Sequence, residues 1–209
     1  MIEAPAQKKT TFTDRMRTAF KWLLNPIVAF LNRAGIRPNT VTLAGLIGTI
    51  GSAVLISSGH LTWAGIVLLF MGPVDALDGA LARLRKEASD WGAFVDAVTD
   101  RYSELFIFGG FILHYLFNPD PVGIILAYLA AAGSVLTSYV KARADAQKLD
   151  ANVGVLTRVE RYLVLIPGLI LNLPLPTLAI VAVLSNLTAL QRIAQARKDA
   201  LRRKSLPQE

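Results

Sequence analysis

The feature that most constrains the fold of this chain is a series of long apolar segments joined by short polar connections. Six segments are long or apolar enough to be candidate membrane-spanning helices: 41–57, 61–82, 91–117, 122–140, 162–173 and 175–190. A spanning helix needs about 20 mostly apolar residues. Only 18% of the residues are charged, against about 25% in a typical soluble domain. The sequence therefore predicts an all-α integral membrane protein with six transmembrane helices.

The fifth segment is the shortest and is interrupted by Pro167 and Gly168. It reaches full length only if the helix begins near Val155, which would bring Arg158 and Arg161 into its first turns. The N-terminus is polar, so no cleavable signal peptide is expected. The chain contains no cysteine, which excludes both a disulfide framework and a cysteine-ligated metal site.

A single domain covering residues 1–209 is expected, with a segment before the bundle and a tail after it. We expect residues 1–38 to form a cytoplasmic or interfacial segment, 39–195 the six-helix bundle, and 196–209 a cytoplasmic tail that is mobile after Arg197. Apolar side chains from Phe12 to Phe30 recur at helical spacing between Arg and Lys, which predicts an amphipathic helix in the membrane interface, broken near Asn25 and Pro26. The alternative is a soluble helix packed against the bundle.

Basic residues lie on alternate connections only. The connections near His60, at 118–121 and at 172–174 contain no Lys or Arg. With six spans all basic residues then lie on one side, and the positive-inside rule identifies that side as the cytoplasm. We therefore expect a multi-pass protein of the cell membrane with both termini and the functional site facing the cytoplasm. The net charge of +7 is explained by contact with anionic lipid heads, so no nucleic-acid partner is expected.

Four aspartates lie within this apolar chain, in the pattern D-x-x-D-G-x-x-A-R-x8-G-x-x-x-D-x-x-x-D. Carboxylates near a membrane core are costly unless they are paired or bind cations, so four together indicate a functional site. Spacings of three and four residues put each pair on one helix face. The short connection between the second and third segments predicts that these helices are antiparallel neighbours. Two facing stripes would form an oxygen-rich site suited to Mg²⁺ or Mn²⁺, with ligands Asp75, Asp78, Asp96 and Asp100.

This pattern resembles the signature of the CDP-alcohol phosphotransferases, integral membrane enzymes of phospholipid synthesis, and every fixed position of that signature is filled. The resemblance extends over nearly the whole chain and includes the P-N-x-x-T sequence at 38–42. It implies a six-helix bundle, usually a homodimer, with a polar cavity open to the cytoplasm.

The resemblance also implies the reaction. A hydroxyl of an acceptor alcohol attacks the lipid-side phosphorus of CDP-diacylglycerol or a similar CDP-lipid, and CMP leaves. Two metal ions would neutralise the phosphoryl oxygens. By the family's pattern Asp75 and Asp96 bridge both ions, Asp78 binds one, and Asp100 binds the other and acts as the catalytic base. The CMP portion and its pyrophosphate would be held by Asn39, Thr42, Gly79, Arg83 and Ser89.

The acceptor is expected to be a small polar alcohol, and one that carries a phosphate. The strings S-Y-V-K-A-R-A-D at 138–145, R-V-E-R at 158–161 and Q-R at 191–192 look like those of prokaryotic phosphatidylinositol phosphate synthases, which use inositol 1-phosphate. Val159 and Thr157 depart from that subgroup without removing a cation. Cations at the matching positions would bind the acceptor phosphate: Lys141, Arg143, Arg158, Arg161 and Arg192. For each of them the alternative role is as a positive-inside topology marker.

Other assignments remain open from the sequence. Phosphatidylglycerophosphate synthase, with glycerol 3-phosphate as acceptor, also handles a phosphorylated alcohol, and related archaeal enzymes use CDP-archaeol as donor. An intramembrane prenyltransferase would have more adjacent acidic residues and usually more spans. A cation transporter would need polar residues that continue through the outer half of the bundle, where helices two and three are almost wholly apolar.

Overall fold

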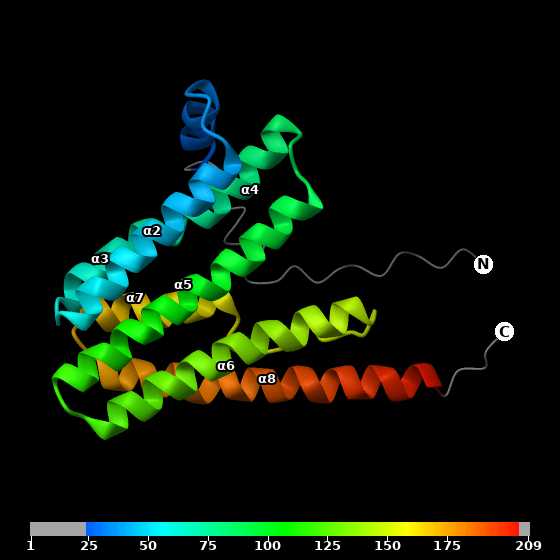
Figure 1. Cartoon of the computed structure of the whole chain (residues 1–209). Helices are drawn as coiled ribbons and strands as arrows, with labels where there is room; N and C mark the ends of the chain where they lie inside the picture. The colour runs from blue at the N-terminus through cyan, green and yellow to red at the C-terminus, as the bar shows by residue number, and fades with distance from the viewer. Residues whose placement is uncertain (1–23, 205–209) are drawn as a thin grey trace.

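The computed structural model describes residues 24–204, apart from the side chain of Asp75, and every regular element within that range is a helix (Figure 1). Residues 24–33 are helical. Seven further helices follow: α2 (Pro38–Ser57), α3 (Leu61–Met71), α4 (Val74–Arg85), α5 (Asp90–Phe117), α6 (Pro121–Ala146), α7 (Arg158–Ile170) and α8 (Pro174–Lys204).

Four stretches in the described range are long and apolar enough to span a membrane: Pro38–Ser57, Leu61–Arg85, Pro121–Ala146 and Pro174–Lys204. The other two expected spans fall short for different reasons. α5 has 28 residues, but its first 15 carry five charges, at Asp90, Asp96, Asp100, Arg101 and Glu104. α7 has 13 residues, too few to cross alone, although it does start at Arg158. The expectation of a membrane-embedded helical protein holds, and the count of six spans stays a prediction.

The second expected span is divided into α3 and α4 at Gly72 and Pro73. Proline lacks the backbone N–H that would continue the hydrogen-bond ladder, and its ring clashes with the preceding turn. α4 therefore begins as a separate helix just before the aspartate motif.

Two groups of buried apolar side chains hold the helices together. The larger lies between α2, α3, α5, α6, α7 and α8 and includes Ile56, Leu68, Phe108, Phe111 and Leu169. The smaller joins the helix at 24–33 to α2 and α4 through Leu24, Val28, Val41, Leu77 and Leu81. One face of residues 24–33 thus packs against the bundle, while Ile27 and Phe30 on this helix are exposed. Pro26 lies within the helical stretch, so the expected break at Asn25–Pro26 is not observed; residues 12–23 lie outside the described range.

One expectation about neighbouring helices is wrong. α4 and α5 make almost no direct contact within the described chain; both pack against α2 instead, and Figure 1 shows them splayed apart. The facing residues include Gly79, Gly92 and carboxylates, which offer little apolar surface for packing.

The helix α8 continues to Lys204, so residues 196–204 of the expected tail are helical. Asp199 stabilises this end by pairing with Arg203 at 2.7 Å and accepting a bond from the Asp150 amide.

Candidate active site

A cavity of about 360 Å³ lies between α2, α4 and the start of α5. This volume is within the range of small-molecule sites, which is roughly 300–1,000 Å³. The structure brings all five sequence-predicted nucleotide residues to this cavity, together with two of the aspartates: Asn39, Thr42, Gly79, Arg83, Ser89, Asp78 and Asp96. Residues more than 50 positions apart in the chain therefore line one space.

Helix ends position these side chains. Pro38 is in the first turn of α2, where its missing N–H is no loss because that N–H has no partner within the helix. This first turn places Asn39 and Thr42 at the cavity. α4 ends at Lys86, whose left-handed conformation (φ 57°) turns the chain toward α5. Ser89 then caps α5, since its Oγ accepts a hydrogen bond from the Gly92 amide at 3.1 Å. Ser89 thus has a structural role in addition to lining the cavity.

The Arg83 guanidinium lies beside Gly79 on α4. A Cβ at Gly79 would be 3.4 Å from Arg83 Nη1, at the edge of ordinary van der Waals contact. The guanidinium remains exposed and offers parallel donors that match a phosphate. Arg85, two residues on, is engaged differently: it donates to the side chain and the backbone carbonyl of Asn32.

The aspartates border two spaces that share some of their lining residues. Asp78 is buried and accepts a hydrogen bond from Thr42 Oγ1 at 2.5 Å, so Thr42 orients a carboxylate as well as lining the cavity. Asp96 borders the large cavity. Asp100 is buried and borders a smaller space of about 20 Å³, which Asp78 and Thr42 also line. The side chain of Asp75 lies outside the described part of the structure.

The donor set suits a hard divalent cation. The candidate ligands are all carboxylate oxygens, the kind that Mg²⁺ and Mn²⁺ prefer. Among the described side chains no three acidic or histidine groups lie close enough together to hold an ion. Asp75, an expected bridging ligand, is not among those side chains. The chemistry of the residues therefore fits a metal, while the complete ligand set stays a prediction.

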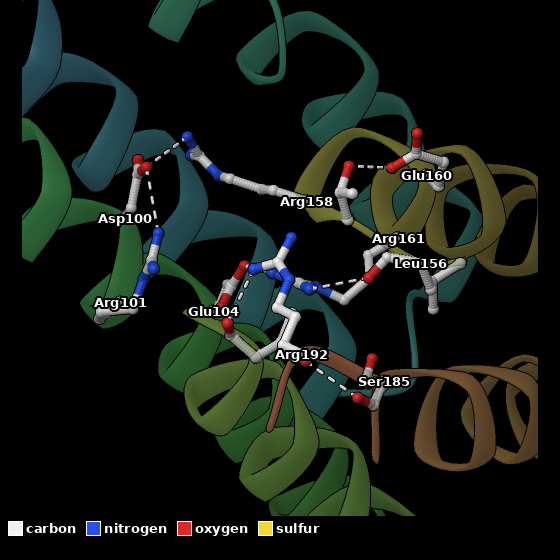
Figure 2. Close-up of polar contacts among 11 residues, drawn as sticks. Asp100, Arg101, Glu104, Leu156, Arg158, Glu160, Arg161, Ser185 and Arg192 are labelled. Atoms are coloured by element: carbon white, nitrogen blue, oxygen red, sulfur yellow. Dashed lines mark hydrogen bonds and ion pairs between the residues drawn. The ribbon is translucent and has the colours of Figure 1, made fainter. Parts of the chain in front are cut away.

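Three of the five expected acceptor cations, Arg158, Arg161 and Arg192, lie among protein hydrogen-bond acceptors (Figure 2). Arg158 Nη1 lies 2.6 Å from Asp100 Oδ2 and borders the smaller space. Arg161 is buried and forms an ion pair with Glu104. Arg192 donates to the carbonyls of Val153 and Thr137. The structure therefore gives these three cations protein partners, and of the three only Arg161 is buried.

The remaining two cations lie near the C-terminal end of α6. Lys141 pairs with Asp145 one turn further along the helix. Arg143 is exposed. The structure does not gather the five cations into one open pocket.

Sequence reasoning missed Glu104. The sequence did indicate that Glu104 has a partner. Glu104 follows Asp100 by one helical turn, and a charged side chain inside an apolar bundle needs a partner. The partner, Arg161, is far away in sequence and was assigned to the acceptor instead.

Comparisons with known proteins agree with this geometry. Residues 36–197 match the family model for CDP-alcohol phosphatidyltransferase. A phosphatidylinositol phosphate synthase of Streptomyces avermitilis is 35% identical over 213 residues, which cover 94% of this chain and 86% of that protein. An uncharacterised protein of Aquifex aeolicus is 33% identical over 186 residues, covering 89% and 95%.

Solved structures are also similar. Phosphatidylinositol phosphate synthase of Mycobacterium tuberculosis with CDP-DAG bound has a TM-score of 0.76 at 30% identity, covering 83% of this chain and 92% of that one. The same enzyme in complex with manganese and citrate has a TM-score of 0.78 at 30% identity, covering 83% and 88%.

Proposed function

This chain belongs to the CDP-alcohol phosphatidyltransferase family, and we propose that its acceptor is inositol 1-phosphate. The family activity is metal-dependent transfer of a phosphatidyl group from a CDP-lipid to the hydroxyl of an alcohol, with release of CMP. The observation that carries the assignment to this site is the cavity between α2, α4 and α5, because all five expected nucleotide residues line it beside Asp78 and Asp96.

The proposed binding of the donor follows from the chemistry of that cavity. Arg83 and the first turn of α2 hold the pyrophosphate and the cytidine portion, with Gly79 and Gly92 leaving room beside them. Arginine binds phosphate oxygens through two parallel N–H donors. Thr42 keeps the Asp78 carboxylate in one orientation by donating its hydroxyl proton.

The aspartates are proposed to hold two Mg²⁺ or Mn²⁺ ions, with the roles expected from the family's pattern. When bound, such ions neutralise charge on the phosphoryl oxygens. The proton transfer is assigned to side chains of the protein itself. Asp100 accepts the proton of the attacking hydroxyl, and the Arg158 guanidinium lies beside it, 2.6 Å away.

The acceptor proposal rests on the named relatives and on the cations near Asp100. Several relatives that are 34–35% identical are phosphatidylinositol phosphate synthases. Arg158 borders the same small space as Asp100, so an acceptor phosphate at Arg158 would leave its hydroxyl within reach of the base. Phosphatidylglycerophosphate synthase activity remains the second candidate, since glycerol 3-phosphate also carries a phosphate.

One assay separates these acceptors. Purified protein is incubated with CDP-diacylglycerol and Mg²⁺ or Mn²⁺, and inositol 1-phosphate, glycerol 3-phosphate, inositol and serine are offered separately. We expect CMP release and a lipid with the mass of phosphatidylinositol phosphate only with the first. A phosphatidylglycerophosphate product would replace the proposed acceptor with the second candidate. The two-ion stoichiometry is measured by titrating the protein with Mn²⁺, and the expected homodimer by its mass in detergent.

The proposed orientation places the α4–α5 turn and both termini in the cytoplasm of the cell, because the basic residues lie on those connections. A single cysteine at Glu87 and another at Ser58 should be labelled from opposite faces of sealed vesicles. Labelling of both from one face would contradict this topology.

A further inference from the structure

Tyr162 is an aromatic side chain in the wall of the smaller space, near the start of α7. It follows Arg158 by one helical turn, and Asp78 and Asp100 line the same space. The metal and donor roles proposed above do not involve this ring. Tyr162 therefore lies beside both groups that the proposed reaction uses on the acceptor side, the cation Arg158 and the base Asp100.

The guanidinium of Arg158 lies over the ring of Tyr162. The guanidinium carbon is 5.7 Å from the centre of the ring, within the roughly 6 Å over which an aromatic face attracts a cation. Helical geometry favours this contact, because a helical side chain leans toward the N-terminus and covers the residue one turn earlier. Arg158 thus has one contact along its own helix and a second with Asp100, which Figure 2 shows reaching across from α7 to α5.

The ring of Tyr162 is held in place by the bundle. It packs against the larger group of buried apolar side chains. It also lies close to Gly72, between α3 and α4, where an added Cβ would be 3.9 Å from Cδ1 of the ring. An arginine side chain, by contrast, is long and has many rotamers. Tyr162 therefore offers a fixed surface to a flexible cation.

The two contacts of Arg158 differ in what they require. The contact with Asp100, at 2.6 Å, uses an N–H group of the guanidinium and depends on the charge of a carboxylate that is proposed to take up a proton. The attraction to the ring of Tyr162 does not depend on a hydrogen bond, so the N–H groups remain available for phosphate oxygens. It also stays the same whether or not Asp100 carries the proton.

We propose that Tyr162 is a positioning residue of the acceptor site. Its ring holds the Arg158 guanidinium next to Asp100, so that the acceptor phosphate is bound where the acceptor hydroxyl meets the base. This inference rests on the proposed function, in which Asp100 is the base and Arg158 binds the acceptor phosphate. A tyrosine that only packed against the bundle would affect stability and leave the acceptor kinetics unchanged.

The main test changes the ring and leaves Arg158 and Asp100 intact. Tyr162→Leu keeps an apolar side chain and removes the aromatic face. The KM for inositol 1-phosphate should rise by about fivefold to thirtyfold, the size that a cation–π contact of a partly exposed cation supplies. Both kcat and the KM for CDP-diacylglycerol should stay within about twofold of the wild type. Tyr162→Phe keeps the face and should keep the acceptor KM within about twofold.

Two results of this test would overturn the proposal. One is a wild-type acceptor KM in a Tyr162→Leu protein that inserts normally, which would leave the ring with a packing role only. The other is an equal defect in Tyr162→Leu and Tyr162→Phe, which would assign the effect to the hydroxyl. Tyr102→Leu is the matched control, because it removes an exposed ring of α5 that lies beside Phe106. Its acceptor KM should equal that of the wild type.

A second readout separates action through Arg158 from contact with the alcohol itself. Inorganic phosphate is titrated as a competitive inhibitor against the acceptor, with the wild type and with Tyr162→Leu. If the ring acts through Arg158, the inhibition constant should rise by the same factor as the acceptor KM. A raised KM with an unchanged inhibition constant would show that the ring touches the alcohol portion of the acceptor, and would overturn the proposal.

A third measurement does not depend on the insertion of Tyr162→Leu. Phenylalanine and its progressively fluorinated analogues are incorporated at position 162, since each added fluorine weakens the negative potential of the ring face with little change in shape. The acceptor KM should rise stepwise along this series. An acceptor KM that stays constant along the series would overturn the proposal.

Failure of the proposed function is visible in the wild type. If the wild type uses glycerol 3-phosphate and not inositol 1-phosphate, the acceptor assignment is wrong, and the variants are measured with glycerol 3-phosphate, which also carries a phosphate. If an unphosphorylated alcohol is the better acceptor, the proposed function and this inference both fail. If the wild type uses inositol 1-phosphate and the inserted Tyr162→Leu protein uses it equally well, the function stands and only the role of Tyr162 is wrong.

Discussion

The two halves of the candidate site contain the same kinds of charged residue, but their cations differ in exposure and in the partners that the protein gives them. The half formed by α2, α4 and the start of α5 is an open cavity whose key cation, Arg83, is exposed. In the half formed by α5, α6, α7 and α8, the cations Arg158, Arg161 and Arg192 are engaged by protein acceptors. A charged residue in a membrane bundle is thus informative about ligands only once its internal partners are known.

The largest expected effect lies in the open half. Asp78→Asn or Asp96→Asn keeps the side-chain volume and removes a charge expected to hold metal, so CMP release should fall at least about a thousandfold, roughly 4 kcal/mol in barrier height. Fluorescence size-exclusion profiles should show normal insertion. Near-normal turnover by either variant would mean that the open half does not bind the metal.

Next in size is the loss of a buried partner in the closed half. Arg161→Ala leaves the Glu104 carboxylate buried and unpaired, which should lower the free energy of unfolding by about 3–5 kcal/mol. Lys141→Ala removes only a partly exposed pair with Asp145, worth about 0.2–1 kcal/mol. Thermal midpoints of the two variants in one detergent test this difference. Equal midpoints would show that Arg161 is not structural.

Arg83 and Arg85 lie two residues apart on α4, so substitutions at these two arginines can be compared directly. Arg83→Ala should raise the KM for CDP-diacylglycerol by roughly tenfold to a hundredfold, because a charged hydrogen bond to phosphate contributes about 1.5–3 kcal/mol. Arg85→Ala should leave that KM unchanged and lower stability slightly through lost bonds to Asn32. A larger KM effect at Arg85 would place the pyrophosphate elsewhere.

The smallest effect concerns the α6–α7 connection. Hydrogen bonding from the Asn152 amide lowers the pKa of Asp150 below its ordinary value of 3.8. A lowered folded-state pKa stabilises the protein above the unfolded value, and this contribution is lost as pH falls through the folded value. Asp150→Asn should therefore flatten the acid side of the thermal-midpoint profile between about pH 5 and 3. An unchanged profile would show that Asp150 does not tether the connection.

The sequence predicted which side chains gather in the open half because that information is local, while the ligands that they bind stay a prediction. The motif from Asp75 to Asp100 spans two helix ends, and fixed spacing decides which side chains share a face. The P-N-x-x-T segment was linked to it by resemblance, and the structure brings both to one cavity. The role of Thr42 in orienting Asp78 was not predictable, because it depends on how α2 crosses α4.

The closed half was harder to predict because its partners are distant in sequence. Glu104 and Arg161 are 57 positions apart, so neither spacing nor composition pairs them. The splay of α4 and α5 was likewise missed, since a short connection usually joins packed neighbours and only the lack of apolar facing surface argued otherwise. The division of the second span at Pro73 followed from proline chemistry that was visible in the sequence.

The splay of α4 from α5 has a consequence for how the enzyme meets its substrate. Leu84 on α4 and Trp91 and Phe94 on α5 are exposed apolar side chains, each next in the chain to a residue that lines the cavity, and Trp91 stacks on Phe94 with ring centroids 5.6 Å apart. A donor lipid can therefore keep its hydrocarbon chains among the neighbouring lipids while only its head group enters the cavity. Turnover would then depend on the two-dimensional density of CDP-lipid in the bilayer. Diluting the donor with inert lipid at constant total donor should slow the enzyme, whereas diluting the whole vesicle suspension should not.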